Sequence, residues 1–276
     1  MNAGGSVVSG WQFIDGSWYY MDGNGRMQKG WQFIQGHWFY MFSSGSMAKG
    51  WQKIDGQQYY MNNSGEMVTG WQKIDGHRYY MNRSGVMLTG WNYIGGYKYY
   101  MNASGHLMED LDGILPKQSQ YYITVNRRTC QVMVYAKDGG NGFIIPVKTF
   151  ACSVGLPSTP TQEGTYRTQD KHRWKMLMGP SWGQYATRIY GGVLFHSVAG
   201  SSQSSYNIKA SSYNKLGSPA SHGCVRLTVR DAKWIYDNCV SGTTVKISDH
   251  LDAPFSKPAT IKIPAGQNWD PTDPAI

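Results

Sequence analysis

The stretch "GWQKIDGQQYYMNNSGEMVTG", residues 50–70, ends on the Gly that opens the next copy of the same pattern. Five Gly-Trp pairs mark the copies, at residues 10–11, 30–31, 50–51, 70–71 and 90–91. An aromatic-Tyr-Met triplet follows each pair at a constant interval, so the repeat length is 20 residues without slippage. A fixed period of this length is typical of stacked structural repeats.

Each copy contains the sequence signal of a β-hairpin. Two short aromatic segments flank a turn dipeptide such as Asp55-Gly56, and Asp-Gly favours a tight hairpin turn. One hairpin cannot bury its aromatic face alone, so we expect the hairpins to stack into a solenoid over residues 1–108. We interpret four methionines as filler between copies, because Met adapts to irregular gaps: Met27, Met47, Met67 and Met87.

The Trp and Tyr side chains carry more surface than stacking requires. Where Trp11, Trp18 and a Tyr of the next copy converge, their π faces can enclose a quaternary ammonium group. The pattern resembles the choline-binding and cell-wall-binding repeats of Gram-positive surface proteins, over residues 10–108. The resemblance implies choline or another wall-polymer component as partner, and the candidate residues are Trp11, Trp18, Trp31, Trp38, Tyr40 and Tyr60.

The copies differ at the position before the aromatic-Tyr pair. It is Trp18 and Trp38 in the first two copies, but Gln58, Arg78 and Lys98 in the last three. A cationic side chain inside a cage for a cation opposes the ligand. Full cages are therefore expected only in the first two copies, and the later ones bind sugar or act as a spacer.

The repeats end near residue 108, and a polar linker is expected at 109–120. The remainder, residues 121–276, reads as a second β-rich domain, with half-buried alternating strands and a Pro-rich tail that forms a final edge segment. One short helix is expected, starting at a capping box formed by Thr228 and Asp231. The predicted fold class is mainly β, a hairpin solenoid followed by a β-rich domain.

"SHGCVRL", residues 221–227, brings together the residue types of a nucleophilic site. Cys224 would lie in the turn just before the helix, where the helix terminus or a nearby histidine lowers the thiol pKa. Two other readings stay open on the residues alone. Cys224 is a buried structural side chain, or it belongs to a zinc site, whose ligands would be His196, His222, Cys224 and Cys239.

"FHS" at 195–197 followed by "SHGCVRL" resembles the L,D-transpeptidase family, over residues 121–250, and "STPTQEGTY" at 158–166 extends the likeness. The resemblance implies Cys224 as nucleophile, His196 as general base, and the Ser197 carbonyl as the group that orients the ring. The remaining roles that it implies are oxyanion stabilisation by amides of His222, Gly223 and Cys224, substrate binding by Ser221 and Arg226, and an acceptor path lined by Tyr190.

The same resemblance implies attack on a peptidoglycan tetrapeptide stem and a Cys thioester acyl-enzyme. An amine acceptor then gives a 3–3 cross-link, whereas water makes the protein an L,D-carboxypeptidase. A non-catalytic wall-binding surface protein is the further alternative. The 24 residues between His196 and Ser221 exceed the usual family spacing, so this loop is expected to be a lid or to form a different acceptor channel. No cofactor or metal is expected.

Composition excludes some other classes. The formal net charge is +9, but no Lys/Arg block or RNA-binding motif accompanies it, so nucleic acid is not an expected partner. No apolar run approaches the roughly 20 residues of a membrane span, and no secretory signal precedes the repeats. We therefore expect a mature, secreted, cell-wall-associated protein. Four cysteines do not make a disulfide framework, which leaves either free thiols or one bridge between Cys130 and Cys152.

Overall fold

The computed structural model describes residues 7–276, which form two compact units. The first comprises the residues up to Asn92 together with Tyr100–Met108, and the second comprises Tyr93–Tyr99 with Glu109–Ile276. The expected linker, residues 109–120, belongs to the second unit. Leu111 is buried there, and its amide donates to the Val147 carbonyl at 3.0 Å.

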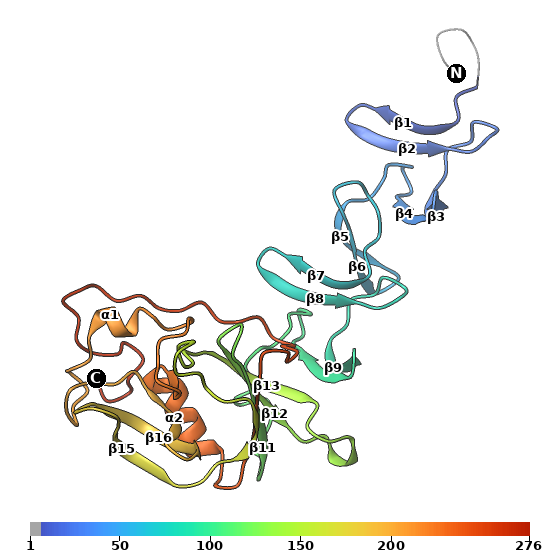
Figure 1. Cartoon of the computed structure of the whole chain (residues 1–276). Coiled ribbons are helices and arrows are strands. Elements are labelled where there is room, and N and C mark those ends of the chain that lie inside the picture. Colours follow the sequence, from blue (N-terminus) through green and yellow to red (C-terminus); the bar gives the residue numbers. More distant parts are fainter. Residues whose placement is uncertain (1–6) are drawn as a thin grey trace. The chain divides into compact units, whose positions relative to one another are not determined.

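Five antiparallel hairpins repeat every 20 residues, which confirms the predicted unit (Figure 1). Their strands are β1 (Gly10–Ile14) with β2 (Ser17–Met21), β3 (Gly30–Ile34) with β4 (His37–Met41), β5 (Gly50–Ile54) with β6 (Gln57–Met61), β7 (Gly70–Ile74) with β8 (His77–Met81), and β9 (Gly90–Ile94) with β10 (Tyr97–Met101). At the predicted turns both central residues have positive φ, 49° at Asp55 and 79° at Gly56. Two-residue hairpin turns of type I′ require this backbone, which Asp-Gly adopts readily.

Methionines join each hairpin to the next. A Cβ placed on Gly45 would lie 2.1 Å from the Met27 sulfur, so the absence of a side chain at Gly45 makes room for Met27. The Met47 amide donates to the Trp18 carbonyl at 2.8 Å, and the same bond recurs in the following copies. The interpretation of these methionines as packing between repeats is confirmed.

Two sheets build the second unit. The five-stranded sheet has the order β13-β12-β11-β19-β14, with bounds Ile145–Ala151, Gln131–Ala136, Tyr121–Asn126, Thr244–Ser248 and Gly164–Arg167. The four-stranded sheet has the order β15-β16-β17-β18, with bounds Lys171–Met176, Trp182–Tyr190, Val193–Ser197 and Val225–Leu227. A short 3₁₀ turn, η1 (Gly139–Asn141), lies between β12 and β13.

The predicted antiparallel pair at residues 121–136 is confirmed as β11 and β12. The expectation that these strands are half-buried is wrong for β12, since all six of its residues are buried. β12 lies between β13 and β11 in the sheet, which covers both of its edges. The side chain of Gln131 donates to the Phe255 carbonyl at 3.0 Å.

Helix α2 (Val229–Asn238) begins where the capping residues predicted it. Thr228 Oγ1 accepts a hydrogen bond from the Asp231 amide at 3.2 Å. The expectation that Cys224 directly precedes this helix is wrong, because strand β18 intervenes. The field of a helix terminus falls off within about one turn, so α2 is not placed to act on the sulfur.

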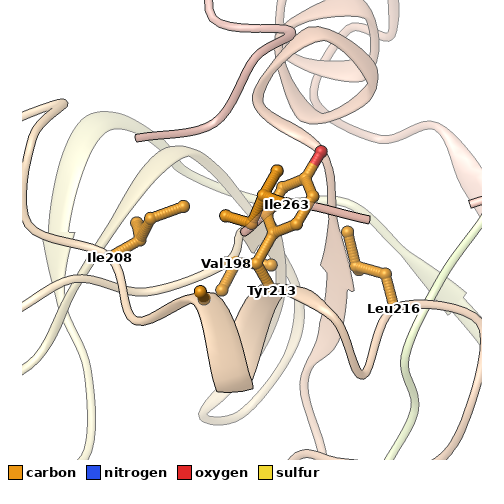
Figure 2. Packing of buried hydrophobic residues seen from close by; sticks show 6 residues of the cluster. Val198, Ile208, Tyr213, Leu216 and Ile263 are labelled. Carbon is orange, nitrogen blue, oxygen red and sulfur yellow. The ribbon is translucent and has the colours of Figure 1, made fainter. Parts of the chain in front are cut away.

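Part of the long loop after His196 is packed into the domain. It contains a second short helix, α1 (Ala210–Tyr213), which the sequence did not predict. Figure 2 shows Tyr213 among the buried side chains of its cluster, which include Val198, Ile208, Leu216 and Ile263. The cluster fastens the loop to the C-terminal tail that carries Ile263.

The tail was expected to form a final edge segment, and residues 251–276 contain no strand. The side chain of Asn214 holds the tail, since it bonds both the amide and the carbonyl of Ile263, each at 2.9 Å. It takes the place of a neighbouring strand. Further along, Asp270 accepts from the Val229 amide at 2.7 Å, at the start of α2. Within residues 7–276, none of the helices has the length and apolar character needed to cross a membrane.

Candidate active site and aromatic cages

Parallel pairing of β17 and β18 assembles the site. His196 lies on β17 opposite Arg226 on β18, and Cys224 immediately precedes β18. A cavity of about 310 Å³ lies here, lined among others by His196, His222, Cys224 and Arg226. The strand pairing therefore brings the thiol and the imidazole, which are far apart in sequence, to one cavity.

The hydrogen bond of His196 fixes its tautomer. Nδ1 lies 2.6 Å from the Ser197 carbonyl oxygen, and a carbonyl can only accept, so Nδ1 carries the proton and Nε2 carries the free lone pair. The ring is 1% exposed. Burial, assisted by the positive charge of Arg226, lowers the pKa of His196 to about 4. The imidazole is thus neutral and able to accept a proton at ordinary pH.

Cys224 is a protonated thiol in the free protein. Burial raises its pKa, while the Leu194 amide and the charges of Arg226 and Arg188 act in the opposite direction. The sulfur contacts the Gly192 carbonyl oxygen at 3.6 Å, as a donor. The expectation of a thiol pKa lowered by a helix terminus or an imidazolium is therefore wrong for this state, which pairs a thiol with a neutral imidazole.

The SHGC turn is held by its own side chain. Ser221 is fully buried, and its Oγ donates to the Cys224 carbonyl at 2.6 Å and accepts from the Gly223 amide at 3.2 Å. Two expectations change as a result. The Ser221 hydroxyl is engaged within the turn rather than offered to a substrate, and the Gly223 amide is bonded to it rather than directed at an oxyanion.

The loop at residues 155–163 lies beside the site. Thr161 Oγ1 donates to the Gly223 carbonyl at 2.8 Å and accepts from the Gly155 amide at 2.9 Å. The Leu156 amide donates to the Ser221 carbonyl at 2.9 Å. These bonds brace the turn that carries Cys224.

Arg226 and His222 both line the cavity. Arg226 Nη1 donates to the Ala220 carbonyl at 2.8 Å, whereas its buried Nε has no hydrogen-bond partner within residues 7–276. His222 is exposed. Lys175 and Arg188, which the sequence analysis did not single out, also line the cavity, and none of the described residues around it is Asp or Glu. The cavity therefore suits an anionic or carbonyl-bearing group.

Tyr190 is placed outside the residues that line the cavity. Its hydroxyl accepts from the Gln162 amide at 2.8 Å, and its ring stacks on Tyr166 with centroids 4.1 Å apart. Tyr190 thus supports the neighbouring loop, and its role along an acceptor path stays a prediction.

Sequence reasoning missed Gly183 on β16. A Cβ at this position would lie 2.8 Å from His196 Nδ1, so only glycine leaves the imidazole in place. A signal existed, since an isolated glycine inside a strand pattern often marks a close approach. Nothing comparable in the sequence pointed to Arg188 or to the Leu194 amide.

The four cysteines are free thiols, including Cys130 and Cys152, for which one bridge was considered. Cys239 lies buried at the C-terminal cap of α2 and does not line the cavity. Across residues 7–276 there is no group of three or more His, Cys, Asp and Glu side chains placed to hold a metal ion. The alternative of a zinc site containing Cys239 thus has no geometric basis.

Two aromatic cavities lie in the repeat unit. The first, of about 400 Å³, is lined by Trp11, Trp18, Phe39 and Met47 among others. The second, of about 420 Å³, has the equivalent residues one copy later, Trp31, Trp38, Tyr59 and Met67. In each, the two indoles are perpendicular at 6.3 Å, and the third ring lies within 5 Å of the first indole. These are the cages expected for the first two copies.

The third ring is not the predicted one. Tyr40 and Tyr60 do not line the cavities but pack into the apolar clusters between repeats. Successive residues of a strand face opposite sides, so Phe39 and Tyr59 reach the preceding copy while Tyr40 and Tyr60 face their own Trp. The prediction was wrong by one residue.

In the fourth copy a side chain of the protein takes the place of a ligand. The guanidinium of Arg78 lies 4.6 Å from the centre of the Trp71 ring. Arg78 occupies the position of Trp18 and Trp38, so this copy loses one wall and carries its own cation on another. The expected absence of a full cage agrees with this contact.

Sequence comparisons add the family. The L,D-transpeptidase catalytic domain (YkuD) matches residues 120–247, and the choline-binding repeat matches 8–49, 48–89 and 68–110. The Bacillus subtilis protein named "Putative L,D-transpeptidase YciB" is 36% identical over 139 residues, covering 48% of this chain and 68% of that protein. The chain belongs to the L,D-transpeptidase family. It joins choline-binding repeats to an L,D-transpeptidase domain, in that order, as expected of a cell-wall enzyme.

Solved structures were matched over parts of the chain. Choline binding protein F of Streptococcus pneumoniae, with a peptidoglycan analogue, is 35% identical over 50% of this chain and 42% of its own, with a TM-score of 0.37. The transpeptidase LdtMt1 with imipenem is 21% identical over 46% of this chain and 58% of its own, also at 0.37. This L,D-transpeptidase family member spans less than two thirds of either structure.

Proposed function

We propose that the protein is a secreted, Gram-positive-type cell-wall L,D-transpeptidase that forms 3–3 cross-links through a thioester on Cys224. The observation that carries this proposal is the cavity shared by Cys224 and His196, with the imidazole neutral and its Nε2 free. A thiol beside a neutral base is the starting arrangement of nucleophilic acyl transfer.

The steps follow from these groups. His196 Nε2 takes the thiol proton, and the sulfur adds to the carbonyl carbon of the third residue of a tetrapeptide stem. The C–N bond to the terminal D-Ala breaks, the imidazolium returns the proton to the leaving amine, and a thioester remains. An amine of a second stem then displaces the sulfur, forming an amide and restoring the thiol with the proton that this amine loses.

We assign oxyanion stabilisation to the Cys224 amide. The Gly223 amide is engaged by Ser221, whereas the Cys224 amide makes no hydrogen bond within the described chain. A free backbone donor at the nucleophile is suited to the charge that develops on the carbonyl oxygen. Arg226 lines the cavity, and its guanidinium is suited to pair with a stem carboxylate.

The first two repeats bind choline of a wall polymer. Two perpendicular indoles with a third ring surround a space of about 400 Å³, which suits a quaternary ammonium held by cation–π attraction. Anchoring raises the local concentration of stems, so the catalytic cavity need not bind a single stem tightly.

Incubation with purified tetrapeptide muropeptides, followed by mass spectrometry of the products, tests the reaction. Cross-linked dimers that are absent with Cys224→Ala support the proposal. Tripeptide products without dimers would reassign the protein as an L,D-carboxypeptidase. Unchanged muropeptides, with binding to choline resin retained, would leave only a wall-binding surface protein.

A further inference from the structure

The turn between β16 and β17 forms one side of the environment of the nucleophile. Gly192 presents its carbonyl oxygen to the Cys224 sulfur at 3.6 Å. The amide of Leu194, two residues on, favours the anionic form of the same sulfur. The position of this short backbone segment therefore decides which polar groups the sulfur meets.

The strand ladder alone does not fix this turn. The register of β16 with β17 is regular up to Arg188 opposite Leu194, and then shifts before Tyr190 opposite Val193. Gly191, at the turn, has a positive φ of 46°. A register irregularity next to a glycine pair leaves the backbone with few constraints of its own.

The side chain of Arg188 supplies the missing constraint. Its Nη1 donates to the Gly191 carbonyl, and its Nε and Nη2 donate to the two oxygens of Asp170, at 2.5 and 3.3 Å. Backbone bonds hold Asp170 and Arg188 together as well, since the Arg188 amide donates to the Asp170 carbonyl at 3.0 Å. A carboxylate that accepts from two nitrogens along one edge of a guanidinium fixes its plane.

We propose that Arg188, held by Asp170, is a positioning residue that fixes the Gly191–Gly192 turn against the sulfur of Cys224. This inference rests on the proposed function, because it concerns how the nucleophile of that site is held. Arg188 also lines the cavity, so it affects the sulfur in two ways, through its positive charge and through the position of the turn that it holds. Asp170, which bonds Arg188 and does not line the cavity, offsets the positive charge of Arg188.

Charge and geometry can be separated by substitution. The charged and titratable groups that face Cys224 are Lys175 on β15, Arg188 and Tyr190 on β16, His196 on β17, His222 in the SHGC turn and Arg226 on β18. Arg188→Gln removes both the positive charge and the turn contact. Asp170→Asn weakens the hydrogen bonds that hold Arg188 but leaves the positive charge of Arg188 less compensated. Arg188→Lys keeps the positive charge but cannot bond Asp170 and the Gly191 carbonyl at the same time through a planar guanidinium.

The measurement is the pH dependence of Cys224 alkylation by iodoacetamide in the full-length protein, with kcat and KM for muropeptides alongside. The other three cysteines are buried, and Cys224→Ala gives the background rate. We expect Arg188→Gln to raise the apparent thiol pKa by about one unit and to lower kcat by about 10- to 100-fold, with KM little changed. Asp170→Asn should lower kcat without raising the thiol pKa. Arg188→Lys should keep the pKa near that of the natural protein and lose part of kcat.

Arg167→Gln on β14 is the matched control, because Arg167 is exposed, bonds the Gly242 carbonyl and does not line the cavity. The proposal is overturned if Arg188→Gln matches Arg167→Gln in both thiol pKa and kcat. If Arg188→Gln does not fold, Arg188→Lys and Asp170→Asn decide, and unchanged kcat in both overturns the proposal. Failure of the proposed function looks different, since the natural protein would then make no cross-linked product.

Discussion

The aromatic cages and the catalytic cavity differ in how their residues are brought together. Three rings of a cage come from two consecutive 20-residue copies, and the next cage repeats them one period later. The catalytic cavity draws its residues from β15, β16, β17 and the turn before β18, which no period relates. A repeated site can be altered one copy at a time, whereas the catalytic site depends on supports that a sequence motif does not contain.

The largest expected effect separates the two regions. Cys224→Ala removes the nucleophile, so turnover of muropeptides should fall by at least about 1000-fold. Retention on choline resin should stay at the level of the natural protein, because the cages lie in the repeats. Product analysis and resin elution on the same preparation check the loss of turnover and the retained choline binding. Turnover by Cys224→Ala within tenfold of that of the natural protein would exclude Cys224 as the nucleophile.

Gly183→Ala tests a support rather than a reacting group. The new Cβ would lie 2.8 Å from His196 Nδ1, so the ring or the strand must move by several tenths of an ångström. Small displacements of a catalytic group can cost about 100-fold in rate, and we expect a loss of kcat of that order. Gly266→Ala in the C-terminal tail is the comparison, because a Cβ there meets nothing within 4 Å and Gly266 does not line the cavity. Equal activity of the two variants would contradict the support assigned to Gly183.

The fall of kcat/KM at acid pH distinguishes a buried catalytic histidine from an exposed one. Catalysis needs His196 neutral, and burial lowers its pKa to about 4, so kcat/KM should fall only as pH drops through about 4. An ordinary histidine titrates near 6.5, and at pH 5 the two cases differ by about 30-fold in the neutral fraction. Initial rates between pH 3.5 and 8 give the answer, and a half-point near 6.5 would show that the ring is hydrated in solution.

The third repeat offers a gain of function. Trp51 and Tyr79 already lie 4.8 Å apart, as the first indole and third ring do in both cages, and only the second indole is missing at Gln58. Gln58→Trp should add a third cage and raise choline affinity on multivalent resin several-fold, up to about tenfold. Gln57→Trp, one residue away and on the other strand face, is the control. Identical elution of both variants would mean that three rings are not sufficient.

These contrasts also explain what the sequence could predict. The hairpins followed from the period and from Asp-Gly turns, and the pairing of His196 with Cys224 followed from motifs that resemble a known family. The third cage ring was placed one residue away, because strand facing depends on packing between copies. Gly183 and Arg188 were missed because their roles depend on tertiary distances.

One measurement tests the central claim most directly, namely that the sulfur of Cys224 attacks a carbonyl and keeps the acyl group. The intact protein is exposed to a carbapenem, whose opened ring gives a slowly hydrolysed thioester, and is then digested and analysed by mass spectrometry. The account predicts one adduct, on the peptide containing Cys224, and none on Cys224→Ala. A protein that stays unmodified, or an adduct on Cys130, Cys152 or Cys239 instead, would contradict it.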